Sequence, residues 1–414
     1  MKRNSLCFVP LLTVALAAAT NVLGAADATP PGAIRCFPAA PDDAYAAVVV
    51  QRNRRVYHSP QTPGFTCWVG LWTMPDGSVM TSFTQATGPL EGRPMAPLYL
   101  QLKLANPVPG LSRNYDMTGL EQRNVHLRSA DGGETWARVS ADAFETPVNS
   151  AYGEAELALP DGTILREIFG EYLPYNPEFL ATGYIQASHD GSLTWDPPRP
   201  LLDPARYKTR IKRLRRLRDG RLLATGGVQH FAGEEARARV EVWGPAMPLL
   251  AVSSDGGRTW TGPIDVIPPG TRGDWTEEWD AAELPNGDLL ASLRRPDPDD
   301  PKGKHIRWQG LLRKDCAAWD PAEVAPAPFP HSGHPELLVT REGPILYIAQ
   351  SGIYLSSDSG TTWHSLGIAA SGYYPHAVEL QDGLILVLGH VGGDDAYGAI
   401  DQSIVMDTFR LKRR

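Results

Sequence analysis

The feature that most constrains this 414-residue chain is an eight-residue pattern, Ser-x-Asp-x-Gly-x-Thr-Trp, that recurs along its length. In such a segment the Asp and Ser side chains bond a tight turn, Gly takes the strained dihedral angles, and Trp packs over the turn. Four copies are present: Ser129–Trp136, Ser188–Trp195, Ser253–Trp260 and Ser356–Trp363. The second copy has Ser192 at the last glycine position, and a degenerate fifth lies at Asp315–Trp319. Recurrence of this kind predicts a repeat architecture.

A second pattern interleaves with the first: an apolar run, an Asp-Gly-type turn and another apolar run, which is typical of a β-hairpin. The six turns are Asp76-Gly77, Asp161-Gly162, Asp219-Gly220, Asn286-Gly287, Glu342-Gly343 and Asp382-Gly383. We therefore predict an all-β, six-bladed β-propeller over residues 44–414, with Ala44–Val50 or Ile404–Phe409 completing a shared blade. A seven-bladed ring is the alternative, because Gly88–Arg123 is long enough to hide strands, although its Pro and Gly content favours an active-site loop.

The N-terminal segment has the pattern of an export signal. Lys2 and Arg3 precede an apolar run from Leu6 to Ala19, and small residues follow up to Ala26. We expect residues 1–26 to be a signal peptide, residues 27–43 an N-terminal arm, and the mature protein to be secreted or periplasmic with no membrane span. The formal charge of −8 is a poor match for nucleic acid or an anionic membrane.

Three cysteines lie beyond the predicted signal peptide: Cys36, Cys67 and Cys316. A Cys36–Cys67 disulfide would tie the arm to the first repeat, and three buried thiols are the alternative. Because no cysteine spacing resembles a zinc site, the sequence predicts no cofactor and no metal. A structural calcium ion and a metal site formed by histidines of separate blades are left open.

Aligning the six hairpins predicts which residues meet at one mouth of the central channel. The innermost strand of each blade begins at that mouth and the second strand returns to it. The first strands place there Trp68, Gly153, Ile211, Glu278, His334 and Tyr374, and the second strands place there Thr84, Phe169, Gly227, Arg294, Gln350 and His390. Polar groups thus gather in the last three units, opposite an apolar wall that includes Trp68, which is the arrangement a carbohydrate site needs.

At these residues the chain resembles the sialidase (neuraminidase) superfamily, six-bladed propellers that carry Asp-box repeats. The segment EWDAAELPNGDLLASLR is similar to the family's fourth-blade motif, which places the family's Glu at Glu278 and its Arg at Arg294. The segment YPHAVELQDG resembles the motif whose leading Tyr is the nucleophile, which gives that role to Tyr374. The resemblance gives the acid/base role to Asp116, and a solvated loop aspartate is the alternative reading of that residue.

Two of the family's three carboxylate-binding arginines are missing. Cys67 or Trp68 stands where the family's first Arg belongs, and Gln350-Ser351-Gly352 stands where its third belongs. Because guanidinium groups grip a carboxylate through paired charge-assisted bonds, the loss argues against strict sialic acid specificity. Compensation would have to come from Arg54, Arg93 or Arg123.

The resemblance implies a retaining exo-glycosidase that acts on a terminal, acidic sugar. Glu278 would accept the proton of Tyr374 as the phenol attacks, and Arg294, His334, Gln350, His390 and Trp68 would bind the substrate. The same residues could instead serve a polysaccharide lyase, in which a Tyr or His removes the proton beside a uronate carboxylate. A non-catalytic, glycan-binding propeller is the third reading, since fold alone does not fix function.

Overall fold

A computed structural model describes thirteen stretches of the chain: residues 34–37, 44–61, 65–89, 91–94, 118–143, 151–169, 182–230, 246–271, 275–296, 305–316, 318–330, 332–391 and 403–414. Over these stretches the regular secondary structure is β-strand and turn, with no helix. Contacts group Ile34–Arg414 into one compact unit, and the predicted signal peptide lies outside the described residues. No helix within the described stretches is long and apolar enough to cross a membrane.

The first three blades are four-stranded antiparallel sheets in which the strands follow chain order from the channel outward. Blade 1 contains β3 (Phe65–Thr73), β4 (Val79–Thr87), β5 (Glu121–Ser129) and β6 (Ala137–Ala143). Blade 2 contains β7 (Ala151–Ala158), β8 (Ile164–Phe169), β9 (Gly183–Ser188) and β10 (Arg199–Pro200). Blade 3 contains β11 (Tyr207–Arg216), β12 (Leu222–His230), β13 (Met247–Ser253) and β14 (Thr261–Ile264).

The last three blades repeat this order, and two of them recruit strands from the N-terminus. Blade 4 contains β15 (Asp280–Glu283), β16 (Leu289–Pro296), β17 (His305–Asp315) and β18 (Ala318–Pro326). Blade 5 contains β19 (Glu336–Val339), β20 (Ile345–Ala349), β21 (Gly352–Ser356) and β22 (Thr362–Ser365), with β1 (Arg35–Phe37) parallel to β22. Blade 6 contains β23 (Tyr373–Glu379), β24 (Leu384–His390), β25 (Ser403–Arg413) and an outer strand β2 (Tyr45–His58).

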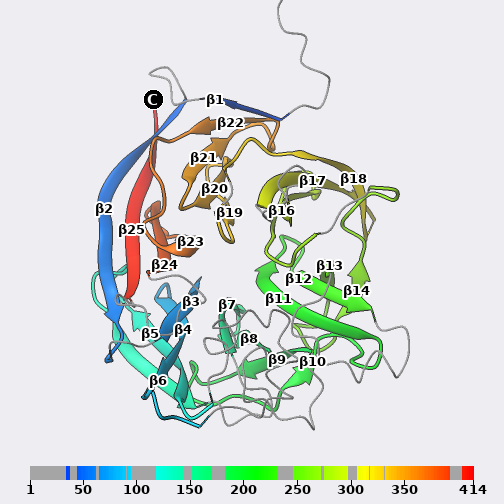
Figure 1. The fold of residues 1–414 in the computed structure, drawn as a ribbon. Coiled ribbons are helices and arrows are strands. Elements are labelled where there is room, and N and C mark those ends of the chain that lie inside the picture. Colours follow the sequence, from blue (N-terminus) through cyan, green and yellow to red (C-terminus); the bar gives the residue numbers. More distant parts are fainter. Residues whose placement is uncertain are drawn as a thin grey trace, which may run out of the picture. The chain divides into compact units, whose positions relative to one another are not determined.

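The six blades close into a ring (Figure 1). Inner strands of neighbouring blades touch in turn, β3 with β7, β7 with β11, β15 with β19, β19 with β23, and β23 with β3, while β12 contacts β15. The N-terminal strand β2 pairs along almost its whole length with the C-terminal strand β25, so both ends of the propeller chain complete one blade. The predicted six-bladed ring is confirmed, and both segments proposed for the shared blade belong to blade 6.

The core is divided into one apolar cluster for each pair of neighbouring blades. For example, Leu165 of blade 2 packs with Leu222 of blade 3, and Phe83 of blade 1 packs with Leu388 of blade 6. Strands such as β4 and β9 are buried at nearly every position because both of their faces meet another blade. Each large apolar side chain so buried contributes about 1.5–3 kcal/mol to the stability of the ring.

Both repeats form the turns that the sequence predicts. In the first Asp box, Thr135 N–H donates to Asp131 Oδ1 over 2.8 Å, and Trp136 Nε1 donates to the Gly133 carbonyl over 3.0 Å. Ser192 adopts φ 77°, so it occupies the left-handed region that glycine fills in the other three copies. The Asp-box turns join the two outer strands of their blades, so they fix the architecture without entering the channel.

No disulfide joins the three cysteines of the described residues, so the Cys36–Cys67 disulfide does not form. Cys36 pairs with Trp363 in blade 5, whereas Cys67 is buried on β3 of blade 1, because the arm joins blade 5 and not blade 1. Cys316 is exposed and Cys36 is partly exposed, so the alternative of three buried thiols is also wrong.

Candidate functional site

The six mouth-level positions lie where an inner strand is irregular or about to begin. Four of them lie at breaks in strand register: Trp68, Gly153, Ile211 and Tyr374. Glu278 and His334 come two residues before β15 and β19. A bulge re-aims a side chain, and the left-handed φ values of Trp68 (56°) and Tyr374 (48°) accompany such breaks. The irregular ends of the inner strands therefore set the direction of the mouth residues.

Tyr374, Glu278 and Arg294 form one contact cluster at this mouth. The Tyr374 hydroxyl donates to Glu278 Oε1 over 2.5 Å, and the Arg294 guanidinium pairs with the same carboxylate. Tyr374 comes from β23 of blade 6, while Glu278 and Arg294 come from the start and the second strand of blade 4. The tyrosine is 3% exposed and the glutamate 6%, so this phenol–carboxylate contact is shielded from bulk water.

Three neighbours hold the pair in place. A Cβ on Gly333 would lie 2.6 Å from the ring of Tyr374, so only glycine permits the close approach of that loop. Tyr373 stacks on Tyr374 with ring centroids 4.4 Å apart. The buried Arg307 donates to the backbone carbonyl of Glu278 over 2.9 Å, which fixes the segment that carries the carboxylate.

A layer of buried charge lies beneath the phenol. Lys212 Nζ lies 6.0 Å from the centre of the Tyr374 ring and donates to Glu154 Oε2 over 2.8 Å, and both side chains are fully buried. Burial alone would raise the pKa of Glu154, but Lys212 holds it well below its usual value. Burial lowers the pKa of His334, which faces Glu154, to about 3, so this imidazole is neutral at physiological pH.

A further carboxyl, Glu167 of β8, reaches the mouth level of blade 3. Ile211 N–H donates to its Oε1 over 2.6 Å, and its Oε2 has no hydrogen-bond partner among the described residues. Burial raises the pKa of Glu167 to about 8, so this carboxyl carries a proton at neutral pH. A buried carboxylic acid of this kind has the properties of a proton donor.

The other predicted site residues occupy different surroundings. His334 is fully buried against the edge of the Tyr374 ring and contacts the Trp279 carbonyl through Nε2 at 3.1 Å. His390 is also fully buried, edge-on to Tyr373 and Tyr374. Gln350 is exposed in the turn after β20, Trp68 is buried on β3, and Asp116 lies outside the described residues. In the described part of the chain, no three His, Cys, Asp or Glu side chains are placed to hold a metal ion.

The three arginines that the sequence offers in place of the missing carboxylate-binding arginines have other partners. Arg54 pairs with Glu134 over 3.0 Å, and Arg123 pairs with Glu121. Arg93 donates to the Thr118 carbonyl over 2.7 Å. Among the described mouth residues, Arg210 pairs with Glu277 over 2.8 Å, just as Arg294 pairs with Glu278 and Lys212 with Glu154.

The hairpin alignment missed Lys212, Glu154, Glu167 and Arg307. Lys212, Glu154 and Glu167 lie one or two residues away from the aligned positions. Arg307 lies on β17, the third strand of its blade, which the alignment did not use. A signal was present on β11, where YKTRIKRLRR places six cations on a strand that leads into an apolar hairpin. Because the inner strand of a propeller is enclosed, cations on it require buried partners.

Comparison with known proteins defines the fold. No family model and no curated protein matches the chain. A Dyadobacter fermentans protein of unknown function is similar in structure, with a TM-score of 0.61, 18% identity, and coverage of 89% of this chain and 100% of that one. A Fusarium graminearum α-L-arabinofuranosidase, solved with an iminosugar inhibitor, has a TM-score of 0.57 and 14% identity, covering 88% of this chain and 98% of that one.

An intramolecular trans-sialidase from Ruminococcus gnavus, solved with oseltamivir carboxylate, is also similar. Its TM-score is 0.55 at 11% identity, and the match covers 86% of this chain and 97% of that one. At such identities the likeness concerns the fold. The chain has the sialidase-like six-bladed β-propeller fold.

Proposed function

We propose that the protein is a retaining glycoside hydrolase that removes a terminal sugar, with Tyr374 as nucleophile and Glu278 as the base that activates it. The observation that carries the proposal is the buried 2.5 Å contact between the Tyr374 hydroxyl and Glu278, paired on its other side with Arg294. The named relatives of the fold, an arabinanase, an arabinofuranosidase and sialidases, support a carbohydrate substrate.

The first step transfers the sugar to the phenol. Tyrosine is a weak nucleophile near neutral pH because its pKa is about 10. As the Tyr374 oxygen bonds to the anomeric carbon, its proton passes to Glu278 and the bond to the leaving oxygen breaks. An acid must protonate that oxygen and later take a proton from the attacking water. Asp116 is the candidate from the sequence, and Glu167 is a second candidate because its carboxyl is buried and protonated.

The proposal includes weak activity on ordinary sialosides. A carboxylate at the anomeric centre favours a phenol nucleophile, since a glutamate would be repelled. However, three cations of the mouth, Arg294, Arg210 and Lys212, already pair with Glu278, Glu277 and Glu154, so none of these three cations is available to bind a sialic acid carboxylate through paired guanidinium contacts. An acidic or deoxy sugar bound by other contacts is the substrate class that we propose. The reaction as proposed needs no cofactor, and from the export signal predicted in the sequence we propose that the enzyme is secreted or periplasmic.

The paired cations also favour a second candidate, hydrolysis of a neutral sugar such as an arabinofuranoside. With no anomeric carboxylate to repel it, Glu278 itself would attack the anomeric carbon, and Tyr374 would position it through the same hydrogen bond. The two candidates differ in which side chain becomes covalently linked to the sugar.

The test is a panel of aryl glycosides, neutral and acidic, with separate recording of reducing sugar and of unsaturated products. On the substrate that is cleaved, we expect Tyr374→Phe to lower kcat by about 10³-fold or more and Glu278→Gln by about 10²-fold or more. Tyr373→Phe is the matched control, since it removes the hydroxyl of the stacked neighbour and should retain activity within a few-fold.

Trapping with a 2-fluoro sugar and peptide mapping then locates the label. A label on Tyr374 supports the first candidate and a label on Glu278 supports the second. Formation of an ultraviolet-absorbing, unsaturated product would instead identify a lyase. If no glycoside in the panel is turned over but glycans are retained by the protein, the hydrolase proposal is wrong and a binding role takes its place.

A further inference from the structure

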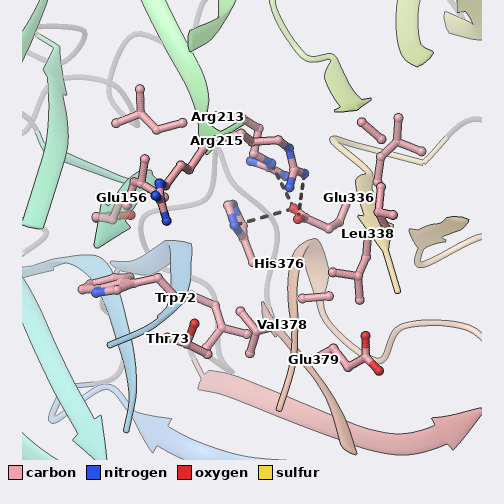
Figure 2. A pocket seen from close by; sticks show the side chains of 18 of the residues that line it. Trp72, Thr73, Glu156, Arg213, Arg215, Glu336, Leu338, His376, Val378 and Glu379 are labelled. Atoms are coloured by element: carbon pink, nitrogen blue, oxygen red, sulfur yellow. Dashed lines mark hydrogen bonds and ion pairs between the residues drawn. The ribbon is translucent and has the colours of Figure 1, made fainter. Parts of the chain in front are cut away.

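A cavity of about 520 Å³ opens on the side of the channel opposite to the Tyr374 mouth. All six inner strands contribute to its lining, at positions close to the Asp-Gly hairpins, as Thr73 of β3 and Glu379 of β23 illustrate. Figure 2 shows this chamber, which contains neither Tyr374 nor Glu278 nor Arg294. Its rim is open to solvent, because Thr73, Arg218 and Arg341 are exposed. We refer to it as the rear chamber.

Buried ion pairs separate the rear chamber from the mouth. Lys212 and Glu154 pair over 2.8 Å and Arg213 and Glu336 over 3.1 Å, and none of these side chains is more than 4% exposed. On β23 the mouth residue is Tyr374, whereas the chamber lining runs from His376 to Glu379. The two ends of the channel are therefore distinct compartments.

Two polar groups enter the rear chamber with unused hydrogen-bonding capacity. Glu156 is 9% exposed and His376 is 6% exposed. Ser82 donates to Glu156 Oε1, and the His376 Nδ1 atom faces Glu336 Oε2 at 3.7 Å. Glu156 Oε2 and His376 Nε2 have no hydrogen-bond partner among the described residues. Since buried polar atoms normally find partners, these two atoms point to a bound molecule.

The charged groups at the inner end of the chamber, around Glu336, pair with one another. Figure 2 shows Arg213, Arg215 and His376 converging on Glu336, and Arg215 also pairs with Asp280. Burial raises the pKa of Glu156 to about 8 and lowers the pKa of His376 well below its usual value, so both groups are uncharged at pH 7. A protonated carboxyl donates a hydrogen bond, and an imidazole with Nδ1–H toward Glu336 accepts one at Nε2.

Part of the remaining wall is apolar, with Leu71, Trp72, Leu337 and Ala377 among its residues, while Arg216, Arg218 and Arg341 lie at the exposed rim. The chamber thus offers an uncharged donor, an uncharged acceptor and an apolar surface. A polyhydroxylated ring matches it, because hydroxyl groups both donate and accept hydrogen bonds and the ring carbons are apolar. An anion or a cation that reached Glu156 and His376 would meet charges that already pair with one another there, those of Arg213, Arg215 and Glu336.

We propose that the rear chamber is a second binding site, which takes a neutral polyhydroxylated molecule of the size of a monosaccharide through Glu156 and His376. This site is independent of the proposed hydrolase activity, since its residues take no part in that chemistry.

The test is calorimetric titration of the full chain with L-arabinose, D-glucose and myo-inositol, and with D-glucuronate as a charged probe. The chamber variant combines Glu156→Leu with His376→Phe, which replaces both polar groups by apolar ones of similar size. The mouth variant combines Tyr374→Phe with Glu278→Gln. Thermal unfolding of every variant shows that it is folded, and Glu156→Gln is the conservative control because its amide still donates.

We expect at least one neutral probe to bind the wild-type protein and the mouth variant with similar affinity, and Glu156→Gln to retain that binding. The chamber variant should lose at least tenfold in affinity. The proposal is overturned if no neutral probe binds, if glucuronate binds more tightly than glucose, or if the mouth variant loses binding while the chamber variant keeps it. The first two outcomes leave the hydrolase proposal intact, since that is tested by turnover.

Discussion

The Asp-box turns and the channel interior both depend on carboxylates, but they use them in opposite ways. In the first Asp box, Asp131 accepts hydrogen bonds from Ser129 and Thr135, two and four residues away, and the turn is open to solvent. In the channel, Glu154 meets Lys212 and Glu336 meets Arg213, partners 58 and more than 100 residues away, with side chains at most 4% exposed.

The difference shows in how the surroundings shift the pKa values. The Thr135 hydrogen bonds lower the pKa of Asp131 to about 2, so its contribution to stability is present above pH 4 and is lost as pH falls from about 4 to 2. In the channel, burial raises the pKa of Glu156 and Glu167 to about 8, because no cation pairs with them directly. Local turns tolerate single changes, whereas the enclosed groups depend on one another.

The largest expected effect comes from breaking the buried Lys212–Glu154 pair. Lys212→Met should lower the free energy of unfolding by about 3–5 kcal/mol, because it leaves the Glu154 carboxylate buried without its cation. Urea denaturation measures the loss. Adding Glu154→Gln should restore most of it, and a double variant no more stable than Lys212→Met alone would contradict the interdependence that distinguishes the channel from the turns.

A smaller effect is expected from the pH dependence of stability. Glu156 and Glu167 remain protonated in the folded chain while they ionise in the unfolded chain, so the wild-type protein should lose stability as pH rises from about 4.5 to 8. Replacing either residue by Gln should remove up to about 4 kcal/mol of that decline, as measured by urea denaturation across this range. Equal slopes in wild type and variants would show that these carboxyls are ionised in the folded state.

The smallest expected effect is at an Asp box. Asp358 accepts hydrogen bonds from Ser356 and from the backbone and hydroxyl of Thr362. Asp358→Ala should therefore cost about 1–2 kcal/mol, since solvent replaces part of what is lost, and Asp358→Asn should cost less because its amide oxygen still accepts. Urea denaturation measures the change. If Asp358→Ala lowers the free energy of unfolding as much as Lys212→Met does, the Asp-box turns and the channel interior do not differ as proposed.

Much of the fold was predictable because its signals are local. The six Asp-Gly-type turns and the four Asp boxes each act within a few residues, and the structure forms them where the sequence places them. The hairpin alignment also brought Tyr374, Glu278 and Arg294 to one level, since positions at the same distance along the chain from equivalent turns reach the same height. The Cys36–Cys67 pairing was wrong because the docking of the arm on blade 5 depends on a partner more than 300 residues away.

The sequence by itself determined the number of blades, the turns that end them and the strand positions that face the mouth, since each depends on hydrogen bonds within a hairpin. Only the tertiary structure decided that Lys212 meets Glu154 and that Arg294 is bound to Glu278. It also decided that Glu156 Oε2 and His376 Nε2 line a rear chamber with no hydrogen-bond partner among the described residues. Those outcomes follow from ring closure, which encloses side chains of all six blades at low dielectric, where charge compensation is set by neighbours in space.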